Sequence, residues 1–154
     1  MTFRSRTLGG LVALATMALV AGCGGDSGPS KAEFVKKADA LCAQTNKAHP
    51  PKPAPKNAKE AAAIWTEEGA IRRDLDKRLK DLDVPDKAKS DFDAYNAGTE
   101  KILGAIDKMA ADAKAGNEKK FGVDQKAFDT AAAEREKSAI KLGFKTCGRK
   151  NPVQ

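Results

Sequence analysis

Residues 86–115 read DKAKSDFDAYNAGTEKILGAIDKMAADAKA, and this stretch decides the fold. Its core positions follow one another at alternating intervals of four and three residues: Ala88, Phe92, Tyr95, Thr99, Ile102, Ile106, Met109 and Ala113. This heptad spacing places them all on one face of an α-helix that packs against antiparallel partners. We therefore expect a helix from about Asp86 to Ala115. Gly116 ends it, because glycine readily takes the left-handed conformation that follows a helix.

The residues before this stretch predict another long helix. Asn57 and Glu60 form an N-terminal capping signal, and Val84 and Pro85 end the helical pattern. The expected buried face consists of Ala61, Ile64, Glu68, Ile71, Leu75, Leu79 and Leu82.

A further helix is expected nearer the N-terminus. Ser30 and Glu33 match a capping box, in which each side chain pairs with a backbone N–H that the first turn leaves free. The expected buried face consists of Phe34, Ala38, Leu41, Cys42 and Thr45. The helix ends near Ala48, because the prolines of residues 49–55 (HPPKPAP) cannot continue it. That segment is typical of a stiff polyproline II linker, with docking to an aromatic-lined partner domain as the alternative.

The last helix has the thinnest pattern. We expect a loop from Asn117 to Val123 and a helix that begins with Asp124 as its N-cap. Its buried face consists of Phe128, Ala131, Ala132, Arg135, Ala139 and Leu142.

Four amphipathic helices and no strand-like alternation predict an all-α domain. Short connections make consecutive helices antiparallel neighbours, so the expected fold is an up-down-up-down four-helix bundle over residues 30–148. A basic, mobile tail is expected at residues 149–154.

The N-terminus has the features of a secretion signal. Arg4 and Arg6 precede an uncharged, mostly apolar run from Leu8 to Ala21. A helix that crosses the hydrocarbon core needs about 20 apolar residues, so this shorter run favours a cleaved signal peptide over a permanent span.

The end of that run, Val20-Ala21-Gly22-Cys23, resembles the lipobox of bacterial lipoproteins. The resemblance implies cleavage before Cys23, a diacylglyceryl group on its thiol and an extracytoplasmic protein anchored to the cell membrane. Residues 1–22 would be the signal peptide, and residues 23–29 the lipidated cysteine with a flexible Gly/Ser spacer. The alternative is an ordinary secretory signal in which Cys23 is incidental.

With Cys23 assigned to lipid, Cys42 and Cys147 remain. Two thiols in an oxidising compartment most often pair, and the bundle topology brings the end of the last helix beside the first. We expect a disulfide between them that closes the bundle. A redox-active or metal-binding thiol is the alternative, but no CxxC motif is present and the single His49 lies in the linker.

Two segments carry a second resemblance. FVKKADALC at residues 34–42 and Cys147-Gly148 resemble small uncharacterised two-cysteine helical lipoproteins and secreted proteins of actinobacteria. The resemblance implies a two-cysteine helical domain and brings no activity or catalytic residue.

The residue content argues against an enzyme. The sequence has one histidine and no glycine-rich phosphate loop, and the Glu-x-x-His pairs of di-iron bundles are absent. The aspartates of residues 74–86 alternate with lysine and arginine and lack the spacing of a calcium loop. We expect no catalytic residue, no metal site and no cofactor.

The charge indicates an interaction at the cell envelope. The formal charge of +7 falls to +5 when Arg4 and Arg6 leave with the signal peptide. A mildly basic surface outside the cell faces anionic lipid or wall polymer rather than nucleic acid. The candidate interaction residues are Trp65, Tyr95, Lys36, Lys37, Lys119 and Lys120. The simpler interpretation is that the two aromatic residues belong to the core and that the lysines keep the domain soluble.

The sequence thus predicts a non-catalytic binding or interaction module, whose partner is anionic lipid, wall polymer or an envelope protein. A structural spacer or accessory subunit of an envelope complex is the alternative.

Overall fold

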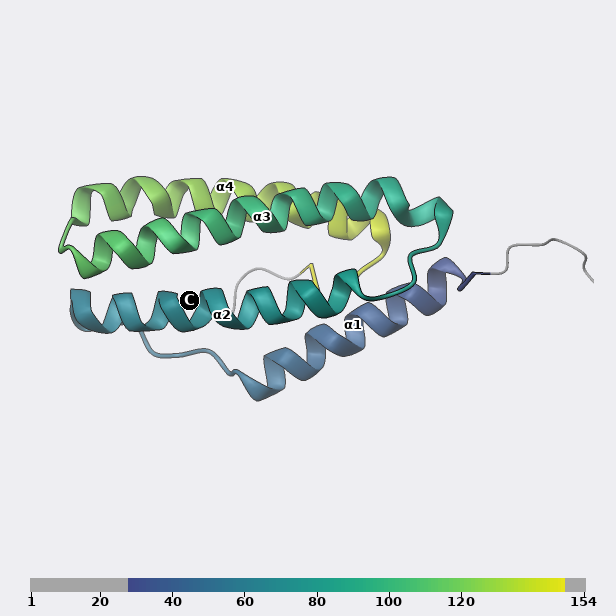
Figure 1. Ribbon diagram of the computed structural model, residues 1–154, viewed down its shortest axis with the longest axis horizontal. Coiled ribbons are helices and arrows are strands. Elements are labelled where there is room, and N and C mark those ends of the chain that lie inside the picture. Colours follow the sequence, from purple (N-terminus) through teal and green to yellow (C-terminus); the bar gives the residue numbers. More distant parts are fainter. Residues whose placement is uncertain (1–27, 149–154) are drawn as a thin grey trace, which may run out of the picture.

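The computed structural model describes residues 28–148, which form four helices and no strand (Figure 1). The helices are α1 (Lys31–Ala48), α2 (Ala58–Lys80), α3 (Asp86–Lys114) and α4 (Glu118–Leu142). The expectation of an all-α domain with four helices is confirmed for these residues. The predicted signal peptide, lipidated Cys23 and C-terminal tail lie outside the described residues.

Helix α3 is the central element, and its predicted buried face is correct at every position. All eight residues of the heptad stripe are buried. Gly116 follows the helix at φ 66°, and the N–H groups of Gly116 and Asn117 donate to the carbonyls of Ala113 (3.1 Å) and Asp112 (2.8 Å). These two bonds form a Schellman motif, so the predicted helix end is also correct.

The predicted caps of α1 and α2 are present. Ser30 and Glu33 form the expected capping box, and the Asn57 side chain accepts from the N–H of Glu60 at 2.9 Å. Helix α1 ends at Ala48, and the proline-rich residues that follow are not helical, as expected.

The predicted start of α4 is wrong. The helix begins at Glu118, six residues before Asp124, and Asn117 is its N-cap. Gly122 suggested a loop, but Phe121 packs against Trp65 with ring centroids 6.4 Å apart. Packing of Phe121 outweighs the low helix propensity of one glycine, which costs only about 1 kcal/mol.

The predicted buried face of α2 is only partly right. Ala61 and Leu79 are buried, whereas Glu68, Ile64 and Ile71 are only partly buried. Trp65 and Gly69, which lie outside the predicted face, are buried as well. The helix turns Trp65 toward α4, where its ring contacts Phe128 at 5.6 Å.

The core consists of two clusters along the bundle. The disulfide-end cluster contains Phe34, Ala38, Cys42, Leu79, Ala88, Phe92, Tyr95, Ala139, Leu142, Phe144 and Cys147. The far-end cluster contains Ala61, Trp65, Ile102, Ala105, Ile106, Met109, Ala113, Phe128 and Ala131. Helix α1 contributes buried residues to the disulfide-end cluster only, and it covers one end of the other three helices (Figure 1).

The predicted disulfide between Cys42 and Cys147 is present, with a Cα–Cα distance of 5.3 Å. Asp39, one turn before Cys42, holds the same segment. Its carboxylate accepts from the backbone N–H groups of Lys145 (2.9 Å), Thr146 (2.8 Å) and Cys147 (3.1 Å). The sequence gives no signal for this clamp, because it joins residues more than 100 positions apart in the chain.

Helices α3 and α4 approach most closely at Gly98. A Cβ atom at this position would lie 2.8 Å from Cβ and 3.1 Å from Cα of Arg135. Only glycine fits here without a shift of α4.

Candidate functional site

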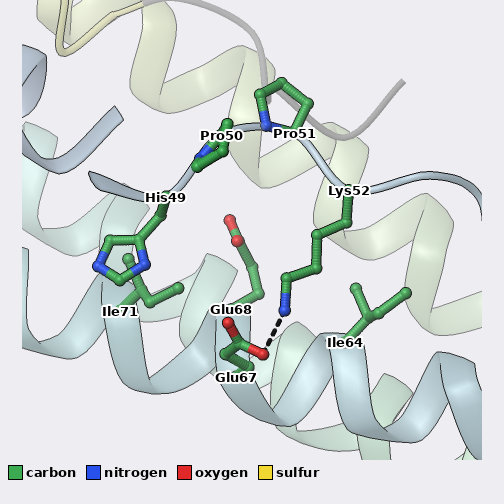
Figure 2. A pocket seen from close by; sticks show the side chains of 8 residues that line it. All are labelled: His49, Pro50, Pro51, Lys52, Ile64, Glu67, Glu68 and Ile71. Atoms are coloured by element: carbon green, nitrogen blue, oxygen red, sulfur yellow. Dashed lines mark hydrogen bonds and ion pairs between the residues drawn. The ribbon is translucent and has the colours of Figure 1, made fainter. Parts of the chain in front are cut away.

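The proline-rich linker lies over α2 and covers a small pocket (Figure 2). Four linker residues, His49, Pro50, Pro51 and Lys52, lie above four α2 residues, Ile64, Glu67, Glu68 and Ile71. The prolines favour extended backbone, so the chain does not prolong α1 but runs along α2 toward the start of that helix.

The pocket has both apolar and charged walls, and the Glu68 side chain points from α2 toward the linker between them (Figure 2). Ile64 and Ile71 line it from below, and the Lys52 ammonium forms an ion pair with Glu67 at one side. Both partners of that pair are about half exposed, so it contributes at most about 1 kcal/mol. This ion pair therefore holds the linker only lightly.

A buried ion pair lies beside this pocket. The Arg72 Nε donates to Glu68 Oε1 at 2.6 Å, and both side chains are largely buried. The Arg72 guanidinium also lies 5.8 Å from the ring centroid of Phe128. Burial lowers the pKa of Arg72, whereas the Glu68 carboxylate opposes that shift. The carboxylate and the aromatic face together hold a cation inside the bundle.

A second guanidinium, that of Arg135, lies near enough to Arg72 for its charge to lower the pKa of Arg72 further. Arg135 of α4 stacks over the Tyr95 ring at 5.3 Å. Burial raises the pKa of the Tyr95 hydroxyl, and the nearby Arg135 charge opposes this effect. The hydroxyl donates to the Cys147 carbonyl at 3.4 Å, so Tyr95 acts as a neutral donor in the core.

These residues belong to a polar layer between the two clusters. We define the polar layer as Glu68, Arg72, Asp76, Asn96, Thr99 and Arg135, which lie between the cluster residues along α2, α3 and α4. Three of its atoms are buried without a hydrogen-bond partner among residues 28–148: Asp76 Oδ1, Asn96 Oδ1 and Arg135 Nε. Each such atom costs about 1–3 kcal/mol, so the layer is the weakest section of the core.

The two candidate aromatic anchors are both in the core. Trp65 is 8% exposed in the far-end cluster, and Tyr95 is 1% exposed in the disulfide-end cluster. Neither ring offers a surface to a partner in this conformation, because each is packed against other aromatic side chains. The core interpretation of both residues is therefore the one that fits.

The four candidate lysines are all exposed but do not form one patch. Lys36 and Lys37 lie near the start of α1, whereas Lys119 and Lys120 lie in the first turn of α4. These two helix starts are at opposite ends of the molecule (Figure 1). One basic surface can therefore include Lys36 and Lys37, or Lys119 and Lys120, but not all four lysines.

Neither the burial of Arg72 nor the linker pocket was predicted from the sequence. Arg72 stands among the alternating charges of α2, where nothing in the pattern separates a buried arginine from an exposed one. Ile64 and Ile71 did carry a signal, because they were expected to be buried and are covered in part by the linker.

No protein-family model matches the chain, and neither a curated protein nor a solved structure matches it. Within the described part of the chain, no group of three or more histidine, cysteine, aspartate or glutamate residues is placed to hold a metal ion. None of the four helices is long and apolar enough to cross a membrane.

Proposed function

We propose that the protein is an extracytoplasmic lipoprotein, anchored to the cell membrane through Cys23, and that its helical domain is a non-catalytic binding module. The observation that carries this proposal is the sequence Val20-Ala21-Gly22-Cys23 at the end of an apolar run too short to span a bilayer. The partner would be anionic lipid, wall polymer or an envelope protein, and not nucleic acid.

The buried disulfide supports an extracytoplasmic location. Cys42 and Cys147 are 2% and 5% exposed and are joined in the structure. Such bonds persist in oxidising compartments and are rare in a reducing cytosol. The remaining cysteine of the chain, Cys23, is then free to carry the lipid.

The fold we propose for this module is an up-down-up-down bundle that the disulfide closes. Ion pairs connect consecutive helices of this bundle: Arg73 of α2 pairs with Asp107 of α3, and Lys101 of α3 pairs with Glu134 of α4. A bundle of this kind has its surface on helix faces and on the linker pocket, which is where a partner would bind.

A structural spacer or accessory subunit is the second candidate. It is favoured by the scarcity of exposed apolar side chains: among the described residues, the large exposed ones are Val123 and Ile140. A surface of this kind suits a passive role, because protein-binding sites usually expose a larger apolar patch.

The anchor is tested by replacing Cys23 with alanine in the full chain. Wild-type protein should fractionate with membranes and incorporate labelled palmitate, whereas Cys23→Ala should incorporate none. The matched control is Cys42→Ala/Cys147→Ala, which removes the disulfide and should leave the label in place. Labelling of Cys23→Ala would refute the lipid anchor.

A further inference from the structure

The positive charge of the domain is concentrated in one segment. Residues 31–59, which form α1, the linker and the start of α2, contain seven lysines and two carboxylates. Residues 60–148 contain 17 basic and 18 acidic residues. The net positive charge of the described residues therefore comes entirely from the segment nearest the N-terminus.

Helix α1 presents part of this charge on a face that is free of acids. The residues of this outward face are Ala32, Lys36, Ala40, Ala43 and Lys47, and all of them are exposed. Their spacing of three and four residues places them opposite the buried stripe of the helix. Figure 1 shows α1 at the edge of the molecule, with no helix on its outer side.

Both carboxylates of α1 are committed to bonds within the domain. Glu33 accepts from the N–H and the hydroxyl of Ser30 at 2.9 and 2.8 Å. Asp39 accepts from three backbone N–H groups of the C-terminal segment. That segment also brings the exposed Lys145 next to α1, which adds a basic residue beside the outward face.

The outward face is also close to the proposed anchor. Cys23 precedes Lys31 by eight positions. An extended chain spans at most about 3.6 Å per residue, so the start of α1 stays within about 30 Å of the lipidated cysteine. A tether of this length raises the local concentration of the domain at the membrane surface.

We infer that the outward face of α1 rests on anionic lipid headgroups and orients the domain on the membrane. The inference rests on the proposed lipid anchor for its geometry. The two acyl chains of the proposed diacylglyceryl anchor suffice to hold the chain at the bilayer. Exposed lysines beside that anchor are attracted to anionic headgroups, so they would set the orientation of the domain. Lipid is the favoured partner over wall polymer, because the tether holds this face at the bilayer.

The test uses residues 23–154 with Cys23→Ser, so that no acyl chain contributes to binding. This protein is sedimented with vesicles of phosphatidylcholine alone or mixed with phosphatidylglycerol. It should bind only the anionic vesicles, and less as salt is added. The test variant Lys36→Gln/Lys37→Gln/Lys47→Gln removes both lysines of the outward face and the exposed Lys37 beside it. Each lysine near an anionic surface accounts for about a fivefold gain in affinity, so this variant should weaken binding up to about a hundredfold.

The matched control is Lys114→Gln/Lys119→Gln/Lys120→Gln, which removes the same charge at the other end of the bundle. It should bind nearly as well as the parent protein, because those lysines face away from the membrane. Glutamine and lysine have similar helix propensities, and circular dichroism checks that both variants are folded.

Three results would overturn the inference. They are no binding to anionic vesicles at low salt, equal loss in both triple variants, and α1-dependent binding to purified wall polymer without binding to vesicles. None of them bears on the lipid anchor itself, which palmitate labelling of the full chain tests separately.

Discussion

The hydrophobic cores at the two ends of this bundle are formed by different elements. At the far end α2, α3 and α4 close the core without help from α1, and large rings such as Trp65 and Phe128 fill the centre. At the disulfide end α1 and the C-terminal segment complete the core, and they come from opposite ends of the domain. The far end therefore depends on contacts between helices that follow one another in the chain, whereas the disulfide end depends on a covalent link between distant segments.

The polar layer separates these two ends. Its buried unpaired atoms and its charged side chains replace apolar contacts in the middle of the core. We therefore expect the two ends to respond differently when the fold is destabilised. The single Trp65 reports on the far end and the single Tyr95 on the disulfide end, so the two can be followed separately.

The largest effect is expected from Cys42→Ala/Cys147→Ala. The chain-entropy model gives about 4–5 kcal/mol for a loop of 105 residues, and the loss falls on the end that the bond closes. In a urea titration, the near-ultraviolet dichroism of Tyr95 should change at lower urea than the fluorescence of Trp65. A single transition by both probes would show that the two ends unfold together.

The next effect concerns the seam at Gly98, which lies beside the polar layer. Gly98→Ala places a Cβ atom against Arg135 and should lower the free energy of unfolding by about 1–3 kcal/mol. Gly104 is the matched control, because a Cβ there meets no neighbouring atom.

Gly104→Ala should therefore raise the free energy of unfolding by up to about 1 kcal/mol, since alanine favours helix over glycine. Thermal unfolding measures both variants. Similar melting temperatures for Gly98→Ala and Gly104→Ala would contradict the close approach of α3 and α4.

The smallest effect is a pH dependence at the start of α1. The hydrogen bond from the Ser30 N–H, with help from the Ser30 hydroxyl, lowers the pKa of Glu33 below its usual 4.5. A carboxyl with a lowered pKa stabilises the fold above its unfolded pKa and loses that contribution as pH falls through its folded pKa. Amide exchange in the first turn of α1 should therefore speed up below about pH 4.5, beyond the intrinsic change.

Glu33→Gln is the control for this pH effect. It keeps an acceptor for the cap but cannot titrate, so the first turn of α1 should exchange with little pH dependence of its own. The same pH response in both proteins would assign the effect to other groups.

The sequence predicted the buried residues of a helix well where other helices pack along its whole apolar face, and less well elsewhere. On α3 the heptad pattern alone identified eight of the ten buried positions, and only Gly98 and Ala105 were not predicted. On α2 the apolar pattern did not predict the burial of Trp65. Trp65 lies on the side of the helix that packs against α4, and the linker covers a different side. At the start of α4 the sequence showed Gly122 but not the ring contact of Phe121 that decides the boundary.

The features of the candidate site were harder to predict for a related reason. The disulfide followed from counting cysteines and from the expected topology, and it is confirmed. The polar layer and the Asp39 clamp require knowing which backbone or ring lies opposite a charged side chain. Neither spacing nor composition contains that information.

The disulfide also has a mechanical consequence. Cys42 and Cys147 lie 105 positions apart, near the two ends of the described chain. A pull on the N-terminus against the C-terminus would pass along the first turns of α1, cross the sulfur–sulfur bond and leave through Gly148. The far end lies within the loop that the disulfide closes, so it carries none of that tension. Its three helices therefore remain packed while the chain ends are under load.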